Sequence, residues 1–201
     1  MAVNRYVDLY PLMTPELPGC TEPMMLQALQ RSMRQFCIDT EAWWETLDSV
    51  NLVEDQTEYN INSTWDAEIK RIKELRINTE DNIAAGNKGA IQDHELYEFI
   101  TPDALILDDN LKPAEDVTGG LEIEVRIIPS ITASSVDPTF LNDWIDAILG
   151  WTMNYLMSMT HKKWSNSDRA AYHMVQYLKG VSNAKAEKVR KRREGHFGLT
   201  A

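Results

Sequence analysis

Apolar side chains recur every three or four positions near the start of the chain, a spacing typical of an amphipathic helix. The helix is expected to begin after Thr21, whose side chain can cap it, and to end near Thr40. Pro23 is compatible with the first helical turn. The predicted buried face consists of Met25, Leu26, Leu29, Met33, Phe36 and Cys37.

The first 20 residues have a different character. They contain Pro11, Pro15, Pro18 and Gly19, a density of helix-breaking residues that predicts an extended arm. An arm of this kind is expected to lie on another surface.

A second helical pattern occupies the last third of the chain. Asp137 and Pro138 predict a helix start, and an apolar stripe continues through residue 160. After a loop at 161–166, Ser167 is expected to cap another helix, whose inward-facing residues are Ala170, Ala171, Met174, Val175, Leu178 and Val181. Beyond Val181 the stripe fades, so the helical extension, which Gly195 can end, is expected to have nothing of its own chain to pack on.

Between the helical regions, short apolar runs are separated by turn residues. Residues 121–127 alternate apolar and charged side chains, as a half-exposed antiparallel strand requires. Residues 57–62, 97–101 and 104–107 are also predicted strands. Residues 68–77 have apolar positions at helical spacing, but their β-branched content and strand neighbours favour a strand with a bulge.

These elements predict an α+β fold in which both ends of the chain build a helical bundle. The predicted parts are an arm at 1–20, the bundle at 21–42 and 137–181, an inserted antiparallel β domain at 43–136, and a protruding basic C-terminal helix at 182–201.

Composition is consistent with a folded protein, because hydrophobic residues make up 43% of the 201 positions and charged residues 25%. Two cysteines, Cys20 and Cys37, are too few for a disulfide framework and lack CxxC spacing. No secretory signal and no apolar run long enough to span a bilayer is found, so we expect an intracellular protein without a membrane partner.

The net charge of −11 is distributed unevenly. Residues 1–160 hold 28 acidic and 10 basic side chains, whereas residues 161–201 hold three acidic and 10 basic ones. The acidic body should repel nucleic acid, while the basic tail is suited to nucleic acid, an anionic membrane surface or an acidic protein surface.

No motif indicates catalysis. His94-Glu95 begins an HExxH-like stretch, but Glu98 occupies the position of the second histidine, and residues 86–89 lack the P-loop spacing. We therefore expect no catalytic, cofactor-binding or metal-binding residues and no enzyme activity. Two interpretations remain open for Trp44, Trp144, Trp151 and Trp164, which can be core residues or interface anchors.

Several sequence stretches resemble those of head-to-tail adaptor (connector or neck) proteins of tailed, particularly short-tailed, bacteriophages. They are residues 33–43 (MRQFCIDTEAW), 127–130 (IIPS), 144–150 (WIDAILG), 163–166 (KWSN) and 170–173 (AAYH), in the same order relative to an arm and a β insertion. The resemblance spans residues 21–195 and is best over 121–180. The polar stretch 80–93 has no counterpart among the family motifs.

The resemblance implies a structural virion protein that is made in the host cytoplasm and joins the portal to the tail in the neck. Members form a ring, dodecameric by analogy, which extends the DNA channel beneath the portal and offers a platform to a tail nozzle or tail tube protein. Genomic DNA passes through its lumen. The C-terminal segment docks on the portal, a role that falls here on Lys185, Lys188, Arg190, Lys191, Arg192, Arg193, Phe197 and Leu199.

A closed ring needs two different patches on each subunit, and the arm and the β insertion are the candidates for neighbour contacts. A stopper or tail-completion protein would follow the same assembly logic. The alternatives from other classes are a nucleic-acid-binding module that uses the basic helix, and an enzyme with an unrecognised site.

Overall fold

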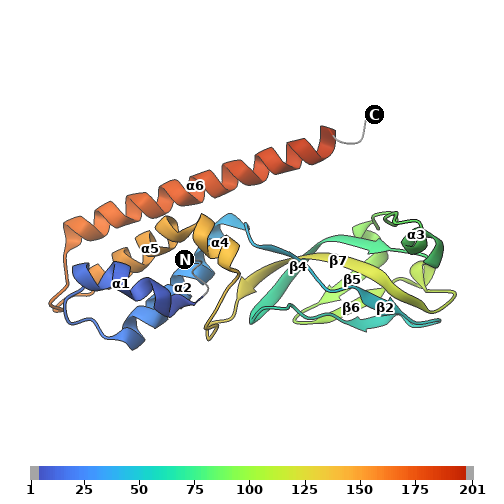
Figure 1. Ribbon diagram of the computed structural model, residues 1–201, viewed down its shortest axis with the longest axis horizontal. Coiled ribbons are helices and arrows are strands. Elements are labelled where there is room, and N and C mark those ends of the chain that lie inside the picture. The colour runs from blue at the N-terminus through green and yellow to red at the C-terminus, as the bar shows by residue number, and fades with distance from the viewer. Residues whose placement is uncertain (1–4, 198–201) are drawn as a thin grey trace. The chain divides into compact units, whose positions relative to one another are not determined.

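The computed structural model describes the backbone of residues 5–197 and the side chains of residues 5–190 (Figure 1). Over this range the chain forms six α-helices and two antiparallel sheets, so the predicted α+β class is confirmed. Contacts divide the chain into a helical unit, residues 1–42 and 129–201, and a β unit, residues 43–128. The second boundary lies eight residues before the end of the predicted insertion, because the loop after residue 129 packs with the helices.

The described part of the helical unit contains three short turns of helix, one long N-terminal helix and three helices from the C-terminal part of the chain. They are the 3-10 helices η1 (Tyr6–Leu9) and η2 (Thr14–Glu16), and the α-helices α1 (Tyr10–Met13), α2 (Glu22–Thr40), α4 (Pro138–Asp143), α5 (Ile145–Met157) and α6 (Ser167–Phe197). Helix α2 begins and ends at the predicted residues, with Thr21 at the N-cap position, although the Thr21 side chain makes no capping hydrogen bond. Helix α5 packs against both α2 and α6.

The predicted extended arm is wrong. Residues 6–16 form η1, α1 and η2, and the side chains of Tyr6, Leu9, Met13 and Leu17 are buried in the core of the helical unit. Pro11 and Pro15 do not prevent this, because they occupy the first turns of α1 and η2, where a missing backbone N–H costs little. This segment therefore belongs to the folded body of its own chain.

The single helix predicted after Asp137 is also wrong. Its start is as expected, since the Asp137 carboxylate accepts a hydrogen bond from the Thr139 amide at 2.8 Å. The chain then leaves helical geometry at Trp144, where φ is −118° and ψ is 16°, and this break separates α4 from α5.

The β unit contains seven strands and short helical turns. Its elements are β1 (Trp44–Thr46), β2 (Val50–Leu52), β3 (Glu58–Asn60), β4 (Ala67–Ile77), α3 (Glu80–Ala84), η3 (His94–Leu96), β5 (Tyr97–Ile100), β6 (Ala104–Leu107), η4 (Asp109–Leu111) and β7 (Val117–Pro129). One sheet has the order β1-β7-β2, with β4 also pairing with β7, and the second has the order β3-β6-β5.

The strand patterns follow from which side chains face inward. Leu121, Ile123, Val125 and Ile127 alternate along β7 and are all buried, as the sequence predicts. In β4 the buried positions are three residues apart, at Ile69, Ile72 and Leu75. That spacing explains why the sequence of this strand also resembled a helix.

Candidate docking surface on helix α6

Helix α6 is held at its first turn by polar contacts from the preceding loop and from α5. The Asn166 side chain accepts a hydrogen bond from the Arg169 amide at 3.0 Å, so Asn166 caps the helix instead of the predicted Ser167. Asn154 of α5 donates to the Ala170 carbonyl at 2.9 Å, and the Trp164 indole donates to the Leu156 carbonyl at 3.1 Å. The buried Trp164 is thus a core residue with its polar group satisfied.

Two glycines allow α5 and α6 to approach closely and antiparallel. A Cβ on Gly150 of α5 would lie 2.9 Å from the His173 carbonyl oxygen, and one on Gly180 of α6 would lie 2.4 Å from the Ala147 Cβ. Neither position has room for a side chain. Because Gly180 meets Ala147 in the first turn of α5, the later turns of α6 extend past the start of α5 (Figure 1).

The middle of α6 is fixed to α2 by a buried tyrosine. The Tyr177 hydroxyl donates a hydrogen bond to the Asp39 carboxylate at 2.5 Å, and Asp39 also accepts from Gln35 at 2.7 Å. Burial, and then the hydrogen bond to Asp39, raise the pKa of Tyr177 well above its usual value. Sequence reasoning missed this residue, although Ala170, Tyr177, Val181 and Ala184 have a helical spacing and are all buried.

The N-terminal segment is tied to the first turns of α6 by a carboxylate. Glu16 of η2 lies 2.9 Å from the Arg169 guanidinium and 3.2 Å from the His173 imidazole, measured to one carboxylate oxygen. The same short helices that bury the predicted arm thus also brace α6.

The last described tie is made by Lys188, whose ammonium lies 2.6 Å from the Glu41 carboxylate. Glu41 follows α2 in a left-handed conformation with φ of 52°, and its amide donates to the Cys37 carbonyl. The cation therefore sits near the C-terminal end of α2, where helix-dipole and ion-pair attractions act together. With Ala184 also buried, the expectation that residues after Val181 have nothing of their own chain to pack on is wrong.

The predicted portal-docking residues fall into three groups. Lys185 and Arg190 are exposed on α6, whereas Lys188 is used in the ion pair with Glu41. Lys191, Arg192, Arg193 and Phe197 lie within the helical backbone of α6, which passes through Gly195, but their side chains are outside the described residues. Leu199 lies outside the described residues altogether.

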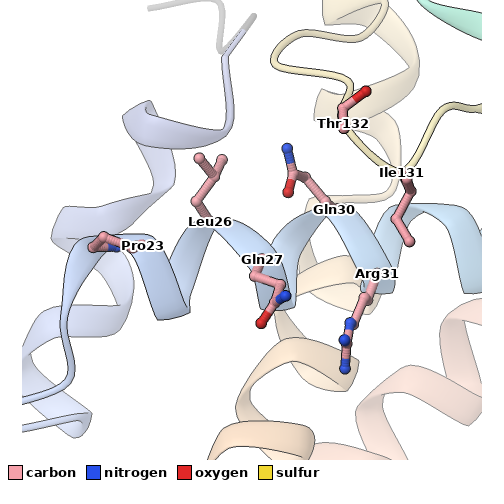
Figure 2. Close-up of a pocket in the computed structure, with 7 residues that line it drawn as sticks. All are labelled: Pro23, Leu26, Gln27, Gln30, Arg31, Ile131 and Thr132. Atoms are coloured by element: carbon pink, nitrogen blue, oxygen red, sulfur yellow. The ribbon is translucent and has the colours of Figure 1, made fainter.

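The helical unit also has a shallow hollow of about 360 Å³ beside α2. Figure 2 shows Leu26 and Gln30 projecting from α2 and Ile131 and Thr132 approaching from the facing loop. Its lining, completed by Pro23, Gln27 and Arg31, contains no carboxylate, histidine or cysteine. The Gln30 amide donates to the Ala133 carbonyl at 3.0 Å, so this polar side chain is engaged within the helical unit.

Within the described residues, no group of three or more histidine, cysteine or carboxylate side chains is arranged to hold a metal ion. His94 instead contacts the ring and hydroxyl of Tyr97. None of the described helices combines the length and the apolar character that a membrane crossing requires. No protein-family model matches the chain, and no curated protein matches it either.

Proposed function

We propose that this protein is a head-to-tail adaptor subunit of a tailed bacteriophage, which assembles into a ring beneath the portal and docks on it through residues 182–201. The observation that carries the proposal is the continuity of α6. This 31-residue helix is anchored between Asn166 and Lys188 and carries on through the basic run at 190–193. A rigid base followed by a cationic, helical end is a suitable arrangement for insertion against an acidic protein surface.

The ion pair of Lys188 with Glu41 gives the docking segment a defined direction. It links α6 to the end of α2 two residues before the basic run, at a separation of 2.6 Å. Lys188 is therefore a positioning residue in this proposal, and Lys185, Arg190 and the following cations are the residues that meet the portal. An oriented helix loses less conformational entropy on docking than a free tail would lose.

The charge of the β unit supports the same role. Residues 43–128 contain 20 acidic and seven basic side chains, a net charge of −13. Five of the basic side chains, Lys70, Lys73, Arg76, Lys88 and Lys112, form ion pairs with carboxylates inside the unit. A surface of this kind repels phosphate groups, which suits a ring through which DNA must slide without binding.

The proposal is tested with full-length protein and the portal ring encoded in the same genome. Replacing Lys191, Arg192 and Arg193 together by glutamine should lower capture by the portal at least tenfold, because the docking surface loses three cations. The matched control replaces Lys70, Lys88 and Lys112 of the β unit by glutamine, which changes the net charge equally and should leave capture as in the wild type. Binding is measured by pull-down and quantified by interferometry at two salt concentrations.

Equal capture of the wild type and the tail variant would contradict portal docking through this segment. The nucleic-acid-binding alternative is examined with the same proteins and duplex DNA at low salt. Tail-dependent DNA binding with a steep salt dependence, together with no portal binding, would favour that alternative.

A further inference from the structure

The predicted inward face of α6 is only partly correct: Ala170 and Val181 are buried, but other residues of that face are exposed and form a new surface. Val175, Leu178 and Val189 are 60%, 54% and 52% exposed, because the face of α6 that packs on α5 and α2 is centred on Tyr177 and Val181. At 3.6 residues per turn, Ala171, Val175, Leu178, Ser182 and Val189 lie within about 60° of one another on the helix. We call these five residues the outer face of α6.

Cations border the outer face of α6. Lys179 and Lys185 are exposed, and neither has an ion-pair partner among the described residues. The surface is thus an apolar ridge with free positive charge at its margins. Exposed aliphatic side chains aligned over five turns of a helix indicate a surface that another element covers.

The β unit has a surface with the opposite charge. In the sheet β3-β6-β5, Glu58 pairs with Ile106 and Ile106 pairs with Glu98, so two carboxylates flank an isoleucine on one face. In the next row of that face, Ala104 of β6 lies between Asn60 of β3 and Ile100 of β5. The Ile100 side chain is 45% exposed. Tyr59 and Leu105 point to the opposite, buried face.

The two carboxylates of this sheet face are also unpaired. Glu58 and Glu98 are both exposed and have no ion-pair partner among the described residues. We call Glu58, Asn60, Glu98, Ile100, Ala104 and Ile106 the outer face of the β3-β6-β5 sheet. It is an apolar strip between negative charges, the complement of the outer face of α6.

We propose that the outer face of α6 in one copy docks on the outer face of the β3-β6-β5 sheet in the next copy. Three strands are about 10 Å wide between their outer axes, which matches the diameter of a helix. In this contact Val175 and Leu178 cover Ile106 and Ile100, and Lys179 approaches the carboxylates of Glu58 and Glu98. Two copies of the α6 face would repel each other, whereas the α6 and sheet faces attract.

Because the two patches differ, the contact is heterologous and propagates from copy to copy, as a closed ring requires. This inference rests on the proposed ring assembly. The N-terminal arm is the other candidate for a neighbour contact, but it is buried in its own chain. In the proposed interface, α6 therefore takes the place of the arm and contacts the β unit of the next copy. None of the residues changed in its test belongs to residues 182–201, so portal docking and self-association are tested separately.

The test uses two full-length variants with reversed charges. Val175→Glu with Lys179→Glu makes the α6 face acidic, and Glu58→Lys with Glu98→Lys makes the sheet face basic. Sedimentation velocity up to about 1 mM protein measures self-association, a range that includes weak contacts. The wild type should associate as its concentration rises, each variant alone should stay monomeric, and an equimolar mixture of the two should associate again.

The control variant, Asp109→Lys with Glu115→Lys, changes the charge of the β unit equally at exposed positions and should associate like the wild type. A monomeric wild type at every concentration would overturn the inference, as would two variants that each associate normally. An equimolar mixture of the two variants that stays monomeric would also overturn it. Portal capture of the same variants reports on the docking proposal independently.

Discussion

At the scale of single residues, the most informative contact is the one between Tyr177 and Asp39. A phenol buried between α6 and α2 donates a hydrogen bond to a carboxylate, and this arrangement favours the neutral form of the phenol. The contact is non-local, since 138 positions separate the two residues. A single sequence contains no signal for such a pairing, although it does contain the helical spacing that places Tyr177 on the buried face.

Replacing Tyr177 by phenylalanine should change how stability depends on pH. The pKa of Tyr177 is raised in the folded state, so the unfolded chain loses this proton first, near pH 10, and stability falls as the pH rises further. Tyr177→Phe should reduce that slope by up to about 1.4 kcal/mol per pH unit. At pH 7 it should cost about 1.5 kcal/mol through the lost hydrogen bond to a carboxylate.

Urea unfolding of both proteins between pH 7 and pH 11 measures the two effects. Tyr172→Phe, at an exposed position of the same helix, is the control for the loss of a tyrosine. An unchanged slope above pH 10 in Tyr177→Phe would contradict the raised pKa of Tyr177 in the folded protein.

At the scale of elements, the packing of α5 against α6 decides where the candidate surfaces lie. Gly150 and Gly180 bring the helices close together, and this rotates Tyr177 inward and Val175 and Leu178 outward. The apolar spacing of the sequence predicts that Val175 and Leu178 face the core of the helical unit. It omits Gly180 and Tyr177, because glycine has no hydrophobic side chain and a tyrosine is not an obvious core residue. The buried face of α6 depends on Ala147, which lies 33 positions away in the chain.

Gly180→Ala should destabilise the protein although alanine favours helices. The new Cβ would lie 2.4 Å from the Ala147 Cβ, and neither atom can move without shifting a backbone. Overpacking of this kind costs about 1–3 kcal/mol, whereas the gain in helix propensity is about 1 kcal/mol. We expect a net loss of about 1 kcal/mol in the free energy of unfolding, measured by urea titration.

Ser182→Ala, an exposed position two residues further along α6, is the matched control and should be neutral or slightly stabilising. Combining Gly180→Ala with Ala147→Gly should recover part of the loss, because the second change removes the atom that the first one meets. A double-mutant cycle with no coupling would contradict the close approach of α5 and α6.

Elements with a strong local pattern could be predicted from the sequence. Helix α2 and strand β7 combine clear periodicity with good end signals, and both are observed. The secondary-structure predictions are wrong where the conformation of a single residue overrides the local sequence pattern. Trp144 breaks a continuous apolar stripe, and Pro11 and Pro15 occupy first turns of short helices instead of preventing them.

At the scale of the whole molecule, charge separates the two units. Residues 43–128 have a net charge of −13, while the remaining residues, which include the basic run at the end of α6, have a net charge of +2. The acidic unit suits a passage for DNA, and the cationic helix suits an acidic docking site. The candidate docking surface could be predicted from composition, but the two complementary faces could not, because they depend on which side of α6 packs inward.

Imaging of portal rings by electron microscopy shows directly whether this protein is an adaptor. Portal rings from the same genome are incubated with the full chain and with the variant in which Lys191, Arg192 and Arg193 are replaced by glutamine. We expect an additional ring of density on one face of the portal, coaxial with its channel, that is strongly reduced with the variant. Bare portal rings at saturating concentrations of the wild-type protein would contradict the adaptor function.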